Sequence, residues 1–465
     1  MDNAARLEAS PELPNSVAQC ERIRRIANRG PAGRLRHCLS VAAEIRGPVD
    51  EAELRARLDG LIARRPALGS MFTGHGTHRL AGGSTELRRQ AVTGPDAASR
   101  WRAAIQIADF EGRRPFFRGE HPLVRGMLLS PEDDHHLLVL TVDQLVGDSW
   151  SANLIIGDLF GAGSARDSRE PDGYAAVWRE RQDWLAGSEG TTVVTERRRH
   201  LADARWRWPI HPDPDEDRPG DVHEQFLALE DPVAAALRAR VRQSRGSVLA
   251  VAAMALVLGV ADDVADTRDQ PFALLTTLAG RETVAEQEAV GWFATDAAIR
   301  LPARRGTVHE YLTALRGEIF AALAAQRVPG ELLAATAADA HQAGPTCALV
   351  YLPRELSGGP PGGQYRLGTA VVSRAAVSVC PTGADIDFYL LEDPPPMTSA
   401  PPAALTVGAL ADGGVADART VSSLLRRWAA TLTVLSGLPW SSTPVTEGGG
   451  LSPWRPGARQ VRRLT

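Results

Sequence analysis

One stretch of the sequence joins a buried strand to a helix through a short polar loop. HLLVLTV at His136–Val142 is a nearly continuous apolar run, which is typical of a strand that is covered on both faces. The polar loop DQLVGDS follows at once, and the apolar spacing from Ser151 to Phe160 predicts a helix. A succession of strand, tight loop and helix predicts a mixed α/β fold.

The other predicted elements agree with this fold class. Asp50 and Glu53 form the pattern of a capping box, so a helix is expected to begin there and to end before Pro66. In the second half, residues 232–261 predict two successive helices, and FALLTT at Phe272–Thr277 predicts a strand. A last helix is expected to end at Gly437.

A chain of 465 residues usually divides into two lobes or domains. Residues 206–221 are rich in proline and acidic residues and lack apolar periodicity, so we expect a linker there. This division predicts an N-terminal lobe at 1–205, a C-terminal lobe at 222–437, and a disordered tail at 438–465.

Composition excludes several functions. The formal net charge is only -4, which argues against a nucleic-acid partner, and the absence of lysine excludes a Schiff base. The longest apolar run, Val248–Ala261, is too short to span a membrane, and no leader-like segment opens the chain. We therefore expect a cytoplasmic protein with no membrane partner.

Metal binding is not expected either. The 4 cysteines are far apart and form no CxxC pair, so we expect reduced thiols and no zinc site. His135 and His136 stand at the entry to a predicted strand, and His75 and His78 stand in a glycine-rich turn without a nearby carboxylate or cysteine. We interpret them as structural or surface residues.

Several stretches, in order along most of the chain, resemble the conserved motifs of nonribosomal peptide synthetase condensation domains. Three stretches in the first part of the chain match family motifs: SVAQ at Ser16–Gln19 matches SxAQ, RRPALGSMF at Arg64–Phe72 matches RHExLRTxF, and PFFRGEHPLVRGMLL at Pro115–Leu129 matches PFDLxxGPLLRxxLL. Three more follow: YAAVWRERQDWL at Tyr174–Leu185 matches YxDFAVWQREWL, VGWFATDAAIR at Val290–Arg300 matches IGFFVNTLPLR, and QRVPGELL at Gln326–Leu333 matches QDVPFEKL. Each match alone is weak, but their shared order is hard to obtain by chance.

The resemblance implies a fold and partners. We expect an α/β structure of two chloramphenicol-acetyltransferase-like lobes that form a V-shaped pseudo-dimer with a central tunnel. Peptidyl or acyl carrier proteins would insert their phosphopantetheine arms from opposite faces, so the protein itself would bind no cofactor. The chain would be a free-standing condensation domain, and an amine or alcohol would be its acceptor.

The family's central motif, HHxxxDG, is degenerate in this sequence. Asp143 takes the place of the first histidine and Gln144 that of the second, which faces the tunnel in the family. Asp148 keeps the aspartate that holds the loop, Ser149 replaces the glycine, and Trp150 matches a tryptophan that is common in the family. The resemblance thus assigns the central site to Gln144 and Asp148, with Asp143, Ser149 and Trp150 as supporting residues.

Two further positions depart from the family. Gly69 stands where the family has an arginine that is expected to support the motif loop, and Thr295 replaces the asparagine of an NT pair and is expected to line the tunnel. Because neighbouring residues at a strand end point to opposite faces, Asp143 should face away from the tunnel if Gln144 faces it. For Asp148 we favour a structural carboxylate that pairs with an arginine or caps the following turn.

Two functions are compatible with this degenerate motif. A neutral amide cannot act as a base, but it can hold reactants in place, and alignment can supply effective molarities of about 10⁵ to 10⁸ M. The first hypothesis is therefore an acyltransferase that forms an amide or ester from a carrier-bound thioester. The second is an inactive platform that recruits carrier proteins or tailoring enzymes, because a fold does not guarantee activity.

Overall fold

The structure is a computed structural model. It describes residues 12–29, 38–73, 76–117, 119–161, 173–211, 221–261, 269–333, 344–353, 365–377, 381–392 and 403–445.

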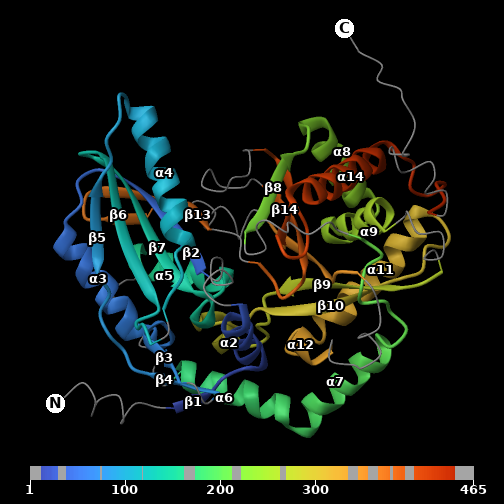
Figure 1. Ribbon diagram of the computed structural model, residues 1–465, viewed down its shortest axis with the longest axis horizontal. Helices are drawn as coiled ribbons and strands as arrows, with labels where there is room; N and C mark the ends of the chain where they lie inside the picture. Colours follow the sequence, from blue (N-terminus) through green and yellow to red (C-terminus); the bar gives the residue numbers. More distant parts are fainter. Residues whose placement is uncertain are drawn as a thin grey trace.

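The N-terminal lobe is built on a six-stranded mixed sheet (Figure 1). Its strands, in spatial order, are β12 (Tyr365–Leu367), β13 (Ala370–Val377), β2 (Cys38–Arg46), β7 (His135–Asp143), β6 (Val124–Glu132) and β5 (Leu87–Ala91). Helices α3 (Glu51–Arg64) and α5 (Ser149–Phe160) bury their apolar sides against one face of this sheet, and α4 (Ala97–Arg113) covers the other. The central strand β7 is buried along almost its whole length, as its apolar run predicts.

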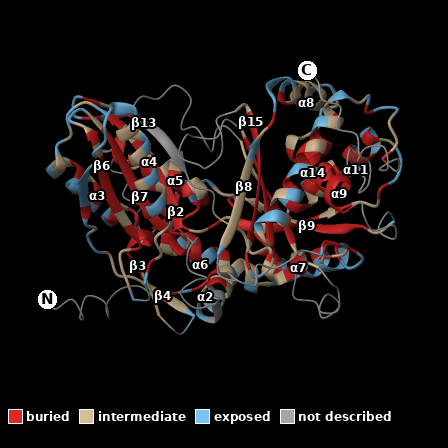
Figure 2. Ribbon diagram, turned by 45° about the horizontal axis from the view of Figure 1, so that its top comes forward, coloured by how far each residue is buried: buried red, intermediate tan, exposed pale blue. Residues whose placement is uncertain are grey.

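The C-terminal lobe repeats this design with a second six-stranded sheet. Its order is β10 (Thr295–Leu301), β9 (Phe272–Leu278), β11 (Cys347–Leu352), β14 (Ile386–Glu392), β15 (Leu405–Asp412) and β8 (Val222–Ala228). The large core on one face is completed by the helices α8 (Asp231–Gln243), α9 (Val248–Val260), α11 (Val308–Leu323) and α14 (Ala418–Gly437). Figure 2 shows α9 buried within this core.

Shorter elements connect the lobes. A three-stranded sheet of β1 (Glu12–Pro14), β4 (Thr77–Leu80) and β3 (Ser70–Phe72) lies beside α6 (Gly173–Ala186), which packs on β1. The next helix, α7 (Ser188–His200), leads to the C-terminal lobe, where it packs near α12 (Gly330–Leu333) (Figure 1). The two remaining helices of the described residues, α2 (Val17–Arg29) and α10 (Val284–Glu288), flank the contact between the lobes.

The elements predicted from the sequence are largely present. Asp50 caps α3 by accepting hydrogen bonds from the backbone of Ala52 and Glu53, and α14 ends at Gly437. The two helices expected in 232–261 are α8 and α9. No single helix in the described ranges is long and apolar enough to cross a membrane. Only α8 and α9 taken together pass that test, and they bend by 113°.

The structure differs from the predicted domain boundaries in two respects. Strands β12 and β13 come from the second half of the sequence but belong to the N-terminal sheet, where β13 pairs with β2. The proposed linker begins with buried residues: Trp208 is fully buried in the C-terminal core, and its indole donates to the carbonyl of Ala273. Local composition could not reveal either feature, because both depend on partners far away in the sequence.

The predicted disordered tail is also partly ordered. Residues 438–445 pack on the C-terminal lobe, with Trp440 and Val445 buried and the backbone of Val308 bonded to that of Thr443. The aromatic and apolar residues of this segment, Trp440 and Val445, are the sequence signal that predicts its packing. Residues 446–465 and 212–220 lie outside the described residues.

Candidate active site

The polar loop after β7 is held rigidly against α2. The strand ends at Asp143, whose side chain accepts a hydrogen bond from the backbone of Leu145 and so caps a single 3-10 turn, η3 (Gln144–Val146). The side-chain amide of Gln19, the last residue of the SVAQ motif, donates to the carbonyl oxygen of Leu145 at 2.7 Å. The SVAQ motif therefore fixes the loop that carries Gln144.

Asp148 is the structural centre of the loop and ties the two lobes together. It caps α5 by accepting hydrogen bonds from the backbone and hydroxyl of Ser151, and it pairs with Arg281 of the C-terminal lobe at 3.0 Å. The backbone amides of Phe293 and Ala294 also donate to it, each at 3.0 Å. The side chains of Arg281 and Asp148 are 0% and 3% exposed. This is the structural role that the sequence favoured for Asp148.

Gln144 is partly exposed, and its amide has one strong partner. The guanidinium of Arg22, on α2, donates to Oε1 of Gln144 at 2.5 Å. The same guanidinium stacks over the ring of Trp292 at 5.1 Å, and Arg22 is 7% exposed. Because arginine only donates hydrogen bonds, the amide oxygen must face Arg22 and the amide nitrogen must point away from it.

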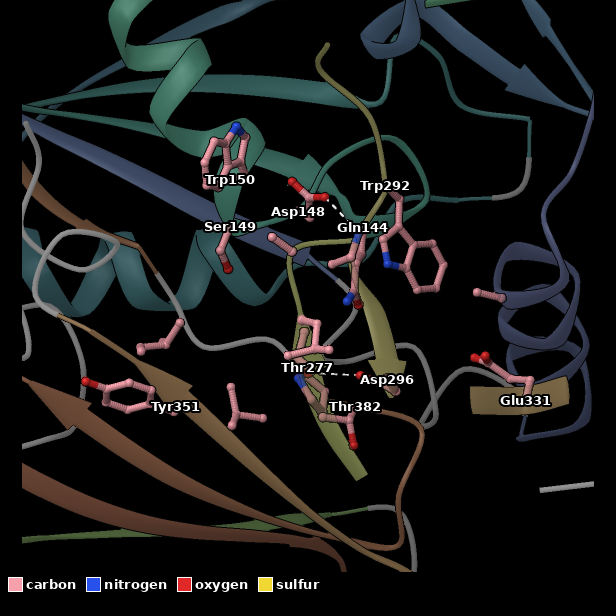
Figure 3. Close-up of a pocket in the computed structure, with 17 residues that line it drawn as sticks. Gln144, Asp148, Ser149, Trp150, Thr277, Trp292, Asp296, Glu331, Tyr351 and Thr382 are labelled. Carbon is pink, nitrogen blue, oxygen red and sulfur yellow. Dashed lines mark hydrogen bonds between the residues drawn. The ribbon is translucent and has the colours of Figure 1, made fainter. Parts of the chain in front are cut away.

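Gln144 lines a pocket between the lobes. Its walls come from α2 and the polar loop on one side and from β9, β10, β11 and the turn before β14 on the other. Figure 3 shows the side chain of Gln144 extending toward the wall that carries Thr277 and Asp296. The lining residues are Ala18, Gln144, Asp148, Ser149, Trp150, Thr277, Leu278, Ala279, Trp292, Ala294, Asp296, Glu331, Val350, Tyr351, Leu352, Pro381 and Thr382.

Asp143 is turned away from this pocket, as its place beside Gln144 predicts. It is 9% exposed and is absent from the pocket lining. Burial raises its pKa to about 6, although Arg22 and Arg125 oppose the rise by stabilising the carboxylate. Asp143 therefore supports the loop and does not face the space in front of Gln144.

The remaining predicted residues are placed as follows. Ser149 and Trp150 line the pocket, and the indole of Trp150 donates to the carbonyl of Gln287 across the lobe interface. Thr295 was expected to line the tunnel, but it does not line this pocket. Its hydroxyl donates to the carbonyl of Gln326 instead. The alternation of side chains along β10 turns its neighbour, Asp296, into the pocket instead.

Gly69 shows why the family's arginine is missing. A Cβ atom at this position would lie 2.6 Å from Cα of Gly82, so the backbones approach too closely for any side chain. The loop is supported instead by Gln19, Arg22 and Arg281. Of these three, only Gln19 lies in a motif that the sequence analysis used, and nothing local marks the other two among 52 basic residues.

The wall opposite Gln144 carries carboxylates that have no cationic partner among the described residues. Asp296 accepts hydrogen bonds from the hydroxyl of Thr277 at 2.9 Å and from the backbone of Gly383 at 3.0 Å. Behind it, Asp387 is buried and bonded to the hydroxyl and backbone of Thr382. Burial raises the pKa of Asp387 to about 7, and the negative charge of Asp296 adds to the rise.

Three of the four histidines that the sequence singled out are described by the structure, and these three do not line the pocket. His135 stacks on Trp101 and bonds to Glu44, and His136 bonds to Ser130. His78 is fully buried against Phe72 and Trp178, and burial lowers its pKa to about 4, while His75 lies outside the described residues. The described residues contain no group of three or more potential metal ligands.

Similar proteins were found by sequence, although no family model matches the chain. The chain is 27% identical over 342 residues to malpinin synthetase of Mortierella alpina, an alignment that covers 69% of this chain and 4% of that protein. It is 26% identical over 323 residues to phosphinothricin tripeptide synthetase PhsC of Streptomyces viridochromogenes, covering 65% and 29%. The chain thus spans less than a third of the length of these curated relatives.

Solved structures share the fold over nearly the whole chain. The SgcC5 protein of Streptomyces globisporus superimposes with a TM-score of 0.71 at 18% identity, covering 89% of this chain and 95% of that one. The first condensation domain of the CDA synthetase gives 0.68 at 18% identity, covering 94% and 99%. The X-domain from teicoplanin biosynthesis, solved in complex with OxyB, gives 0.68 at 19% identity, covering 94% and 95%.

These likenesses confirm the fold that the motifs predicted. The chain has the two-lobed, chloramphenicol-acetyltransferase-like fold of the condensation domains. Its sequence relatives include peptide synthetases, and it shares its fold with solved condensation domains.

Proposed function

We propose that the chain is an acyltransferase that forms an amide or ester bond from a carrier-bound thioester in natural-product biosynthesis. The observation that carries this proposal is the pocket between the lobes, because the intact polar loop presents Gln144 into it. Loss of the histidine removes about 10²- to 10⁴-fold of general-base assistance, but the alignment of two bound reactants contributes more than that. Carrier proteins, which supply the phosphopantetheine arm, are the proposed partners.

The test is product formation by the purified protein. It would be incubated with acyl thioesters on carrier proteins and with amine or alcohol acceptors, and products on the carrier would be detected by intact mass. We expect Gln144→Ala to reduce turnover by about 10²-fold, the typical effect of removing one positioned hydrogen-bond donor. Asp148→Ala should reduce turnover further, because it releases the loop from Arg281.

A matched control removes a carboxylate that does not line the pocket. Asp203 pairs with Arg300 on the surface and is 60% exposed, so Asp203→Asn should leave turnover unchanged. Equal activity in the wild type, Gln144→Ala and Asp148→Ala would refute the assignment of the site.

A second candidate is an inactive platform that recruits carrier proteins or tailoring enzymes. It is favoured by the absence of a histidine at position 144 and by the likeness to the teicoplanin X-domain, which was solved in complex with OxyB. In this case a carrier or tailoring protein from the same biosynthetic system would bind the chain, while product formation would stay at the level of the uncatalysed reaction. Robust turnover would eliminate this candidate.

A further inference from the structure

The pocket contains a hydrogen-bond donor where the motif histidine would offer an acceptor. The oxygen of the Gln144 amide already accepts a hydrogen bond from Arg22, which directs the amide nitrogen toward a ligand. Within the described ranges this nitrogen has no hydrogen-bond partner, and Gln144 is only partly buried. Gln144 is thus suited to donate a hydrogen bond to a carbonyl oxygen, and it cannot take up a proton from an attacking amine.

Three carboxylates line the same pocket, but they are not equivalent. Asp148 is saturated by Ser151, Arg281 and two backbone amides, so it has no free position for a ligand. Glu331 stands on α12, and Figure 3 shows it apart from the cluster of Gln144, Thr277 and Asp296. Asp296 remains as the acceptor on the wall toward which Gln144 extends.

The partners of Asp296 fix its position without neutralising its charge. The hydroxyl of Thr277 and the backbone amide of Gly383 hold one carboxylate oxygen each, and no ion pair among the described residues includes it. Each carboxylate oxygen can accept a second hydrogen bond, so one position on each remains open. A cationic or proton-bearing ligand group is what such a carboxylate would bind.

We propose that Asp296 is a catalytic residue that replaces the missing histidine as the acceptor for an attacking amine. This inference rests on the proposed acyl transfer. The amine nitrogen bonds to the thioester carbonyl carbon, the amide nitrogen of Gln144 donates to the carbonyl oxygen, and the carbon–sulfur bond breaks. The proton that the amine loses passes to Asp296 and from there to the departing thiolate, so Asp296 ends the cycle ionised.

The position of Asp296 in the sequence fits this role. In the motif VGWFATDAAIR it follows Thr295, so it stands where the family pattern has the threonine of the NT pair. The loss of a basic group at position 144 is thus accompanied by the gain of a carboxylate on the facing strand.

The experiment compares two stable analogues of a carrier-bound acceptor by calorimetry. One is glycyl-aminopantetheine, in which an amide replaces the thioester, and the other is its N-acetylated form, which has no basic amine. We expect the wild type to bind the amine form at least about tenfold more tightly, the effect of one charge-assisted hydrogen bond. Asp296→Asn should abolish this preference.

Glu331→Gln is the comparison variant, because it removes the same charge from the same pocket. It should reduce the preference less than Asp296→Asn does, and an equal reduction would overturn the assignment of Asp296. If Asp296→Asn fails to fold, Asp296→Thr replaces it, because it also removes the carboxylate and restores the residue of the family pattern. A full preference in Asp296→Thr would then count against the proposal.

The outcomes separate this inference from the proposed function. Equal binding of both analogues by the wild type, or a preference that survives in Asp296→Asn, would overturn only the role of Asp296. Failure of the protein to bind either analogue would overturn the proposed acyl transfer from pantetheine-bound substrates, and the role of Asp296 with it. Turnover measurements add a second check, because Asp296→Asn should lower kcat for amine acceptors more than Glu331→Gln does.

Discussion

The polar loop on the N-terminal side of the pocket and the strands on the facing side hold their carboxylates in opposite ways. In the polar loop, Asp148 is neutralised by Arg281, and the charges of Arg22 and Arg125 oppose the rise in the pKa of Asp143. On the facing strands, Asp296 and Asp387 receive hydrogen bonds only from hydroxyl and backbone groups among the described residues. The comparison shows that the carboxylate of the motif loop, Asp148, is fully engaged in holding the loop. The carboxylate that remains available to a ligand is Asp296, on the facing side of the pocket.

The largest expected effect is the loss of the pair between the lobes. Asp148→Ala leaves the guanidinium of Arg281 buried without its partner, so the free energy of unfolding should fall by about 3–5 kcal/mol. Denaturant unfolding followed by circular dichroism would measure this. Asp203→Asn, at an exposed pair, should change the same quantity by less than about 1 kcal/mol. Equal effects would mean that Asp148 does not anchor the loop.

Asp387 should make the protein less stable as pH rises. Its pKa of about 7 in the folded protein is above its ordinary value, so the folded state holds a proton that the unfolded chain has lost. Between about pH 5 and about pH 8 this group alone should lower the free energy of unfolding by about 2 to 3 kcal/mol. Asp387→Asn should remove that part of the slope in unfolding curves recorded across this pH range.

Asp143→Asn is the matching variant in the polar loop. Because the hydrogen bond from the backbone of Leu145 and the charges of Arg22 and Arg125 keep the pKa of Asp143 lower, at about 6, its share of the slope should be smaller and should be lost at lower pH. The contrast between the polar loop and the facing strands would be wrong if Asp143→Asn flattened the curve more than Asp387→Asn.

A smaller effect is expected at Gly69. Gly69→Ala places a methyl group against the backbone of Gly82, so one segment must shift, and the free energy of unfolding should fall by about 1–3 kcal/mol. Gly60→Ala, on the exposed side of α3, is the control, because the only close atoms there belong to the flexible side chain of Arg64. If Gly69→Ala were neutral, the absence of the family's arginine would need an explanation other than close backbone approach.

The sequence predicted the elements and the motif loop well, because both depend on local patterns. The apolar run before Asp143 predicted a buried strand, and the aspartate at position 148 could be assigned a structural role from its place before a helix. The collinear motifs added the two-lobed fold. These signals are carried by neighbouring residues.

Long-range partners could not be predicted. Arg22 and Asp296 determine which groups the pocket presents to a ligand. Their spacing from Gln144 carries no periodic signal, and Arg22 is separated from Gln144 by 122 residues in the sequence. Thr295 was chosen because it departs from the family motif, but the alternation of side chains along β10 assigns the pocket to the next residue. To choose between Thr295 and Asp296, it would have been necessary to predict which face of β10 lines the pocket.

The crossing of β12 and β13 into the first sheet has a consequence for synthesis of the chain. Strand β2 gains its second neighbour only from residues 371–377, so the N-terminal sheet remains open at one edge until the ribosome has made most of the protein. A fragment that ends near residue 205 would expose the unpaired backbone of β2, which is a template for aggregation. The N-terminal sheet can therefore be completed only after β13, in the second half of the sequence, has been synthesised.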